Sequence, residues 1–131
     1  PAGRDWLTTI RAEAAALRDA LLAYRDGAEV VSSTHAIGLG SALARDRLAT
    51  AIALGGFDQH TAQRAATTLL HFVLGHVSHE QQRMQFDSIG VLANGASVHD
   101  GAPSSDFAFG VDLLVGGLEL ARDRGFAHPE R

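Results

Sequence analysis

Apolar residues recur at helical spacing through most of the chain, most strongly over residues 57–82. Asp58 stands where it can cap the start of a helix, and Phe57 and Ala62 can pack against each other across that cap. The apolar positions of this stretch are Ala62, Ala65, Ala66, Leu69, Leu70, Phe72, Val73, Leu74 and Val77. They cover the middle of the helix nearly all round, and such a helix must be buried on more than one face.

Three further segments carry the same period and predict helices. They span residues 4–24, residues 37–54 with a start at either 37 or 41, and residues 107–124. The alternating pattern of a strand does not occur over any useful length. We therefore predict an all-α fold in which residues 1–131 form a single domain.

The connections are predicted from breaks in this pattern. Gly27 can end the first helix, residues 32–34 indicate a short loop, and residues 87–105 indicate a long one rich in glycine and serine. Asp5 can cap the first helix and residues 104–106 the last. The long loop is either a flexible connection or a cover over a ligand pocket.

Composition narrows the function classes. The 131 residues are 46% hydrophobic and 20% charged, which is typical of a globular protein. The net charge is −4, so we do not expect this segment to grip a nucleic acid backbone by itself. Cysteine is absent, which excludes disulfides and cysteine-ligated zinc. No stretch is apolar enough to cross a bilayer, and we expect a cytoplasmic protein with no membrane partner.

The central and last helices carry more apolar surface than a small helical domain can bury alone. We expect each to pair with its copy in a second chain, which would form a four-helix bundle across a homodimer. The residues predicted for this interface are Leu69, Phe72, Val73, His76, Val77, Phe107, Val111, Leu114 and Leu118. The alternative is that both helices belong to the core of a monomer.

Several short motifs bear on the family. YRDGA stands at residues 24–28, HFVLG at 71–75, EQQ at 80–82 and GLE at 117–119. Together, at this separation, they resemble the effector and dimerisation domain of TetR-family transcriptional regulators. The resemblance implies a transcriptional repressor that a small-molecule effector releases from DNA. It also implies that DNA is bound only through an N-terminal helix-turn-helix domain absent from this segment, and that the domain is no enzyme.

The resemblance also implies positions that meet the effector. These are Glu13, Leu17, Val31, His35, His71, Leu74 and His79, with Glu80 replacing His79 if the register shifts by one. Val31 stands where the family has a metal-ligating histidine, and valine cannot ligate a metal. We therefore expect a largely apolar effector bound without metal or cofactor, in an apolar cavity near Leu17, Val31 and His71.

Two alternatives remain open. His71, His76, His79 and Glu80 lie at helical spacings at which imidazoles and a carboxylate could hold zinc, which would indicate a metal-dependent helical enzyme. This hypothesis requires at least three of those side chains to converge. The other alternative is a helical dimerisation module that senses no ligand.

Overall fold

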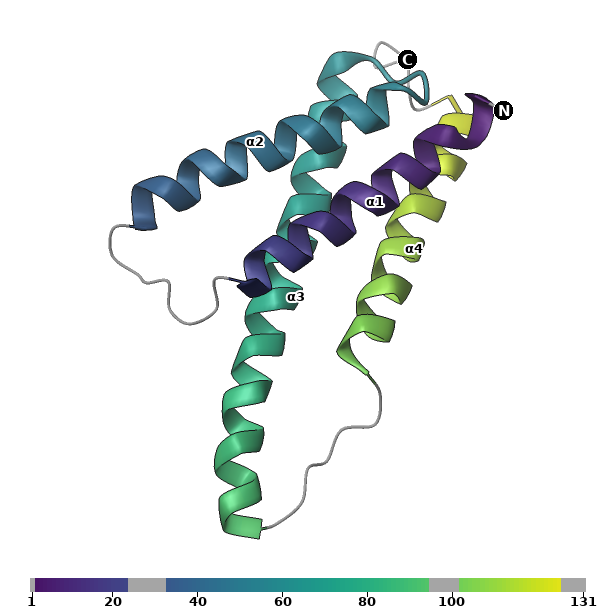
Figure 1. Cartoon of the computed structure of the whole chain (residues 1–131). Helices are drawn as coiled ribbons and strands as arrows, with labels where there is room; N and C mark the ends of the chain where they lie inside the picture. Colours follow the sequence, from purple (N-terminus) through teal and green to yellow (C-terminus); the bar gives the residue numbers. More distant parts are fainter. Residues whose placement is uncertain (1, 24–32, 95–101, 126–131) are drawn as a thin grey trace.

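The structure, a computed structural model, describes residues 2–23, 33–94 and 102–125, with side chains for 5–23, 40–86 and 102–125. Four helices account for most of this part: α1 (Ala2–Ala23), α2 (Ser33–Ala53), α3 (Gln59–Asn94) and α4 (Pro103–Asp123) (Figure 1). The described residues contain no strand, and the predicted all-α class is confirmed.

The long helix α3 is the element on which the other three pack. α1 and α2 lie side by side across one half of it, and α4 runs along its flank and contacts α1 (Figure 1). The other half of α3 extends beyond α1 and α2. Leu69 and Leu70 are both buried although they point to different sides of α3, which confirms that its middle is covered on more than one face.

The turn between α2 and α3 follows the predicted signals closely. Gly56 has a φ of 98°, a conformation that glycine adopts without steric cost, and it lets the chain leave α2. The Asp58 carboxylate accepts a hydrogen bond of 3.2 Å from the Thr61 backbone N–H, which confirms the predicted cap. A hydrogen bond from the Thr61 side chain holds the pKa of Asp58 below its ordinary value, and the Thr61 backbone adds to this effect.

Four helix boundaries differ from the predictions. α3 continues past residue 82 to Asn94, because the fading apolar pattern there contains no proline to stop it. The predicted loop over 87–105 is correspondingly shorter, and α4 begins at Pro103, a residue suited to the first position of a helix. Ala102 is the N-cap of α4 and makes no side-chain cap hydrogen bond. Residues 104–106, which were predicted to cap this helix, lie inside it. α2 begins at Ser33, within the predicted short loop. α1 begins at Ala2, so Asp5 lies inside its first turn and is not the predicted cap.

The first turns of α1 pack against the turn between α2 and α3 and against the end of α4. Trp6 is 2% exposed and meets Phe57 edge to face, with ring centroids 5.7 Å apart. Gly55 lies against the Trp6 ring so closely that an added Cβ would stand 2.5 Å from it. Arg122, near the end of α4, donates a 2.6 Å hydrogen bond to the Gly55 carbonyl and lies 5.9 Å from the Trp6 ring. We call Trp6, Gly55, Phe57 and Arg122 the Trp6 junction.

The core of the subunit contains five residues that were predicted for the dimer interface. They are Leu69, Val73, Val77, Phe107 and Val111, each 5% exposed or less. Helices of the same chain cover these side chains, so that part of the interface prediction is corrected: they have no surface left for a partner. Phe72, His76, Leu114 and Leu118 are half-buried.

Candidate ligand-binding site

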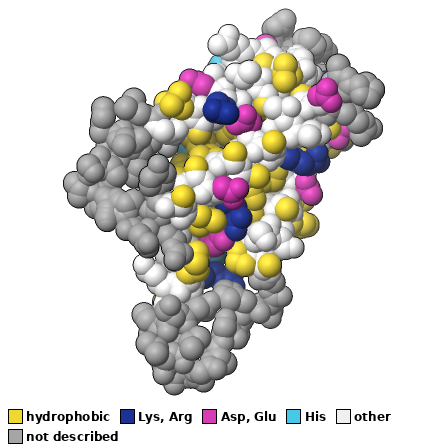
Figure 2. Space-filling view, viewed as in Figure 1, with side chains coloured by type: hydrophobic (Ala, Val, Ile, Leu, Met, Phe, Trp, Pro, Cys, Tyr) yellow, Lys and Arg dark blue, Asp and Glu magenta, His cyan; other side chains and the backbone are white. Residues whose placement is uncertain are grey.

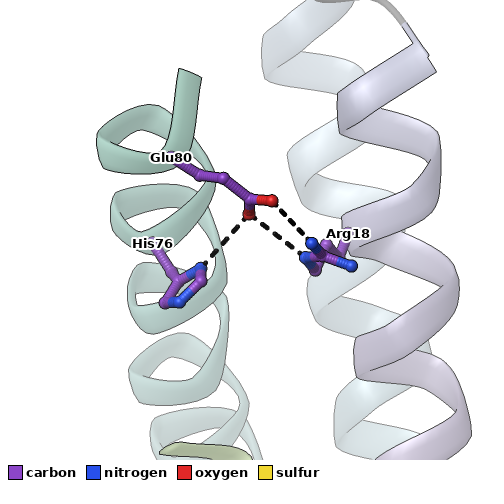
Figure 3. A network of polar contacts seen from close by, with 3 residues as sticks. All are labelled: Arg18, His76 and Glu80. Atoms are coloured by element: carbon purple, nitrogen blue, oxygen red, sulfur yellow. Dashed lines mark hydrogen bonds and ion pairs between the residues drawn. The ribbon is translucent and has the colours of Figure 1, made fainter. Parts of the chain in front are cut away.

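A network of three polar side chains joins α1 to α3. The Arg18 guanidinium donates to both oxygens of the Glu80 carboxylate, from Nη2 to Oε2 at 2.6 Å and from Nε to Oε1 at 3.2 Å. His76, one turn before Glu80 on α3, places its Nδ1 3.5 Å from Glu80 Oε1 (Figure 3). Glu80 is 6% exposed and is the one buried charged side chain among those described. We call Arg18, His76 and Glu80 the Glu80 network.

Burial makes this network costly to break on one side. Two charges taken out of water must be paired and hydrogen-bonded, and a bidentate arginine–carboxylate contact is the geometry that does so best. The side chain of Arg18 is 14% exposed, so it too depends on Glu80. The Nδ1 atom of His76 is buried and has no hydrogen bond within the described residues, because 3.5 Å is too long for one here.

Aromatic rings surround the network. Phe72 of α3 stacks on Phe107 of α4, with centroids 5.7 Å apart and planes 21° apart. His76 meets Phe107 edge to face at 5.4 Å, and the Arg18 guanidinium also lies 5.4 Å from the Phe107 ring centre. Gly110 leaves room for Phe72, because an added Cβ would overlap that ring. A planar cation is therefore already held between a carboxylate and an aromatic ring.

A small cavity of about 40 Å³ opens beside Glu80, between α3 and the start of α4. Its walls are formed by His76, His79, Glu80, Arg83, Met84, Pro103 and Asp106. Such a volume has room for roughly three water molecules. The cavity can therefore take one small polar group, with the rest of a larger molecule outside it.

The residues predicted to meet the effector, where their side chains are described, have different surroundings. His79 lines the cavity, whereas Leu17 and Leu74 pack half-buried against the core and His71 is exposed. Glu13 accepts a hydrogen bond of 3.0 Å from Arg47 of α2. The Val31 residue and the His35 side chain lie outside the described residues. The cavity beside Glu80 thus lies farther along α3 than the position predicted near Leu17, Val31 and His71.

Sequence reasoning missed Arg18. It follows Ile10 and Ala14 at intervals of four, and both of these are fully buried. A charge in line with that buried stripe needs a partner on another helix, and this was the signal available. Pro103 and Asp106 were missed because Pro103 was assigned to a loop and Asp106 to a capping position, rather than to the first turn of α4.

The four residues of the metal hypothesis do not converge. Within the described residues, no three histidine, aspartate or glutamate side chains lie close enough together to hold a metal ion. His71 is exposed, and His76 faces Glu80. The structure therefore gives the metal-dependent enzyme no site at His71, His76, His79 and Glu80.

On the face of the molecule seen in Figure 2, acidic and basic side chains are scattered between hydrophobic ones. The described part of this face has no large patch of a single charge. None of the helices, as far as the structure describes them, combines the length and the apolar character that a bilayer crossing needs.

Comparison with known proteins matches the chain to a protein family. The family described as "Tetracyclin repressor-like, C-terminal domain" matches residues 1–107. The chain is also 31% identical, over 134 aligned residues, to the tetracycline repressor protein class C of Escherichia coli. This alignment takes in 90% of the chain, which spans 60% of that relative's length. No solved structure matches the chain at a significant level.

Proposed function

The chain belongs to the tetracycline repressor-like C-terminal domain family, and on that basis we propose that it senses a small-molecule effector and dimerises within a transcriptional repressor. Domains of this family sense ligands and dimerise in transcriptional regulators. In the proposed mechanism the effector favours a domain arrangement in which a DNA-reading domain outside this segment no longer matches its operator.

The outer face of α4 supports dimerisation and is the observation that carries the proposal. Phe109, Leu113 and Leu120 are 65%, 62% and 51% exposed and share one side of the helix with Gly116 and Gly117. A Cβ added at either glycine would meet nothing within 4 Å in this subunit, so a neighbouring helix could approach closely there. Large apolar side chains gathered on one face mark an interaction surface.

A second copy of the chain fits this face better than another occupant does. The same face of α4 on a twofold-related chain would present the same side chains, as a self-complementary interface requires. α3 lies beside α4, so the pair could form a four-helix bundle with its copy. The proposed interface uses Phe109, Leu113 and Leu120 in place of the five residues buried in the core.

The cavity and the Glu80 network support the sensing role. Glu80 both lines the cavity and binds Arg18 of α1, so a guest molecule can change how α1 is held. A ligand shifts such an equilibrium only by its difference in affinity for the two states, typically about 1–3 kcal/mol. We propose no catalytic residue and no cofactor.

The dimer is tested by placing a charge on the exposed face. Leu113→Glu should convert a dimer to a monomer in sedimentation equilibrium, because two carboxylates would be buried against apolar surface. Leu43→Glu is the matched control, since Leu43 is 66% exposed on α2 and should leave the dimer intact. A wild-type chain that sediments as a monomer would contradict the proposal.

Sensing is tested by thermal unfolding in the presence of a library of small molecules. A ligand that binds the folded state stabilises it by about 2.7 kcal/mol at a hundred times its dissociation constant. Compounds that raise the melting temperature in a saturable way support the sensor. If the chain dimerises and responds to none of them, the pure dimerisation module is the better description.

A further inference from the structure

We propose that the cavity beside Glu80 takes a planar cationic group, such as an amidinium or guanidinium, at one end of a largely apolar effector. We further infer that this group competes with Arg18 for the Glu80 carboxylate. The inference rests on the proposed sensing function and specifies the ligand class and the contact that relays its binding.

Arg18 itself shows which chemistry this part of the molecule binds. Its planar cation is held by two hydrogen bonds to Glu80 and lies 5.4 Å from the Phe107 ring centre. An amidinium on an effector offers the same parallel N–H groups and the same flat, cationic surface. Glu80 also forms part of the cavity wall, so a group bound in the cavity would lie beside the side chain that holds Arg18.

The charges around the cavity favour a cation. Glu80 and Asp106 contribute two carboxylates to the cavity wall and Arg83 contributes one guanidinium, and Arg18 balances Glu80 until a competing cation displaces it. Met84 and Pro103 supply apolar surface beside these groups. A volume of about 40 Å³ suits a single head group, so an apolar body would lie outside it.

Competition at Glu80 would loosen one end of α1. A cation that takes Glu80 Oε1 removes the Arg18 Nε contact, which at 3.2 Å is the longer of the two. His76 Nδ1 lies 3.5 Å from the same oxygen and can follow it. The Trp6 junction lies at the other end of α1 and is unaffected, so the helix could pivot about that junction.

The test uses benzamidine, benzamide and benzoate, which share a shape and differ in charge. Each is titrated into the purified chain at about pH 8, where unperturbed histidines are neutral, and binding is followed by nuclear magnetic resonance of the backbone amides. Benzamidine should bind at least tenfold more tightly than the other two, with shifts at residues lining the cavity and at the end of α1. Equal or tighter binding of benzoate would overturn the inference.

Variants of the pair test the competition itself. Arg18→Met frees Glu80 and should tighten benzamidine binding tenfold or more, whereas Glu80→Gln should abolish it. The double variant Arg18→Met/Glu80→Gln leaves neither charge buried alone, so it should fold and still not bind. Unchanged or weaker binding by Arg18→Met, or binding by the double variant, would show that Glu80 is not the contact.

The outcome is separable from that of the proposed function. A chain that dimerises through α4 and is stabilised by neutral compounds, but does not prefer benzamidine, would overturn this inference and leave the sensor in place. A monomer that binds no compound at all would overturn both.

Discussion

The two ends of α1 are held by opposite kinds of contact. At the Trp6 junction, a 2%-exposed indole ring packs against Phe57 and against the backbone at Gly55. Near the other end, the Arg18 guanidinium is paired with the Glu80 carboxylate. The packed Trp6 ring cannot exchange its neighbours for others, whereas the Glu80 carboxylate can release one cation and bind another.

This contrast shows how one helix can combine stability with response. Close packing is sensitive to shape and does not deform gradually, so the Trp6 junction holds α1 in one position. A buried ion pair adds little net stability over an apolar contact of the same size, yet it is costly to break on one side. Replacing one cation by another at Glu80 should therefore change the free energy of unfolding little. This suits a contact that lies beside the cavity and relays ligand binding to α1.

The largest expected effect is at the Trp6 junction. Gly55→Ala would place a Cβ 2.5–2.7 Å from three atoms of the Trp6 ring, and a buried ring has no open space to move into. We expect a loss of about 3 kcal/mol in the free energy of unfolding, the upper end for overpacking. Urea unfolding followed by fluorescence measures it directly, because Trp6 is the single tryptophan of the chain.

Gly40→Ala is the matched control for this substitution. Gly40 lies in α2, is exposed, and has nothing within 4 Å of an added Cβ. Alanine should raise the free energy of unfolding there by up to about 1 kcal/mol, through helix propensity. Equal losses at Gly40 and Gly55 would mean that the Trp6 ring is not the cause.

A smaller loss is expected at the Glu80 network. Glu80→Gln keeps the size of the side chain but leaves Arg18 buried beside a neutral amide, which should cost about 2 kcal/mol of unfolding free energy. Arg18→Met/Glu80→Gln should recover most of that loss, because it removes both charges. Chemical unfolding of the two variants and the wild type gives the comparison. A double variant no more stable than the single one would show that the unpaired charge is not what destabilises Glu80→Gln.

The sequence predicted the helices well and the ends of some of them poorly, for a physical reason. A strong apolar period locates a helix, and the cap at Asp58 marks a start with a hydrogen bond local to the chain. The end of α3 carries no such mark: its apolar period fades while the backbone stays helical to Asn94. At α4, the proline at residue 103 was a usable start signal.

The candidate site was predictable only as far as one helix carries it. His76 and Glu80 are neighbours on α3 at an interval of four residues, which the sequence shows directly. Arg18 is 62 residues from Glu80, and no local spacing tells which helix faces which. Five of the nine residues predicted for the dimer interface proved to be core residues for the same reason, since an apolar stripe looks alike whether it faces its own core or a partner.

The smallest expected effect is at the cap of α3, which Asp58 forms directly after Phe57 of the Trp6 junction. A hydrogen bond from the Thr61 side chain holds the pKa of Asp58 below its ordinary value of 3.8. A carboxyl group whose pKa is lower in the folded chain than in the unfolded one stabilises the fold above the unfolded value. That contribution is lost as the pH falls through the lowered folded-state pKa.

Asp58→Asn isolates this contribution, because asparagine caps helices about as well as aspartate and does not titrate. The stability of the wild type relative to Asp58→Asn should be constant at neutral pH and should decline as the pH falls below 3.8. Urea midpoints of both proteins, measured from neutral to strongly acidic pH, give the difference. Parallel curves over that whole interval would mean that the Asp58 charge does not stabilise the start of α3.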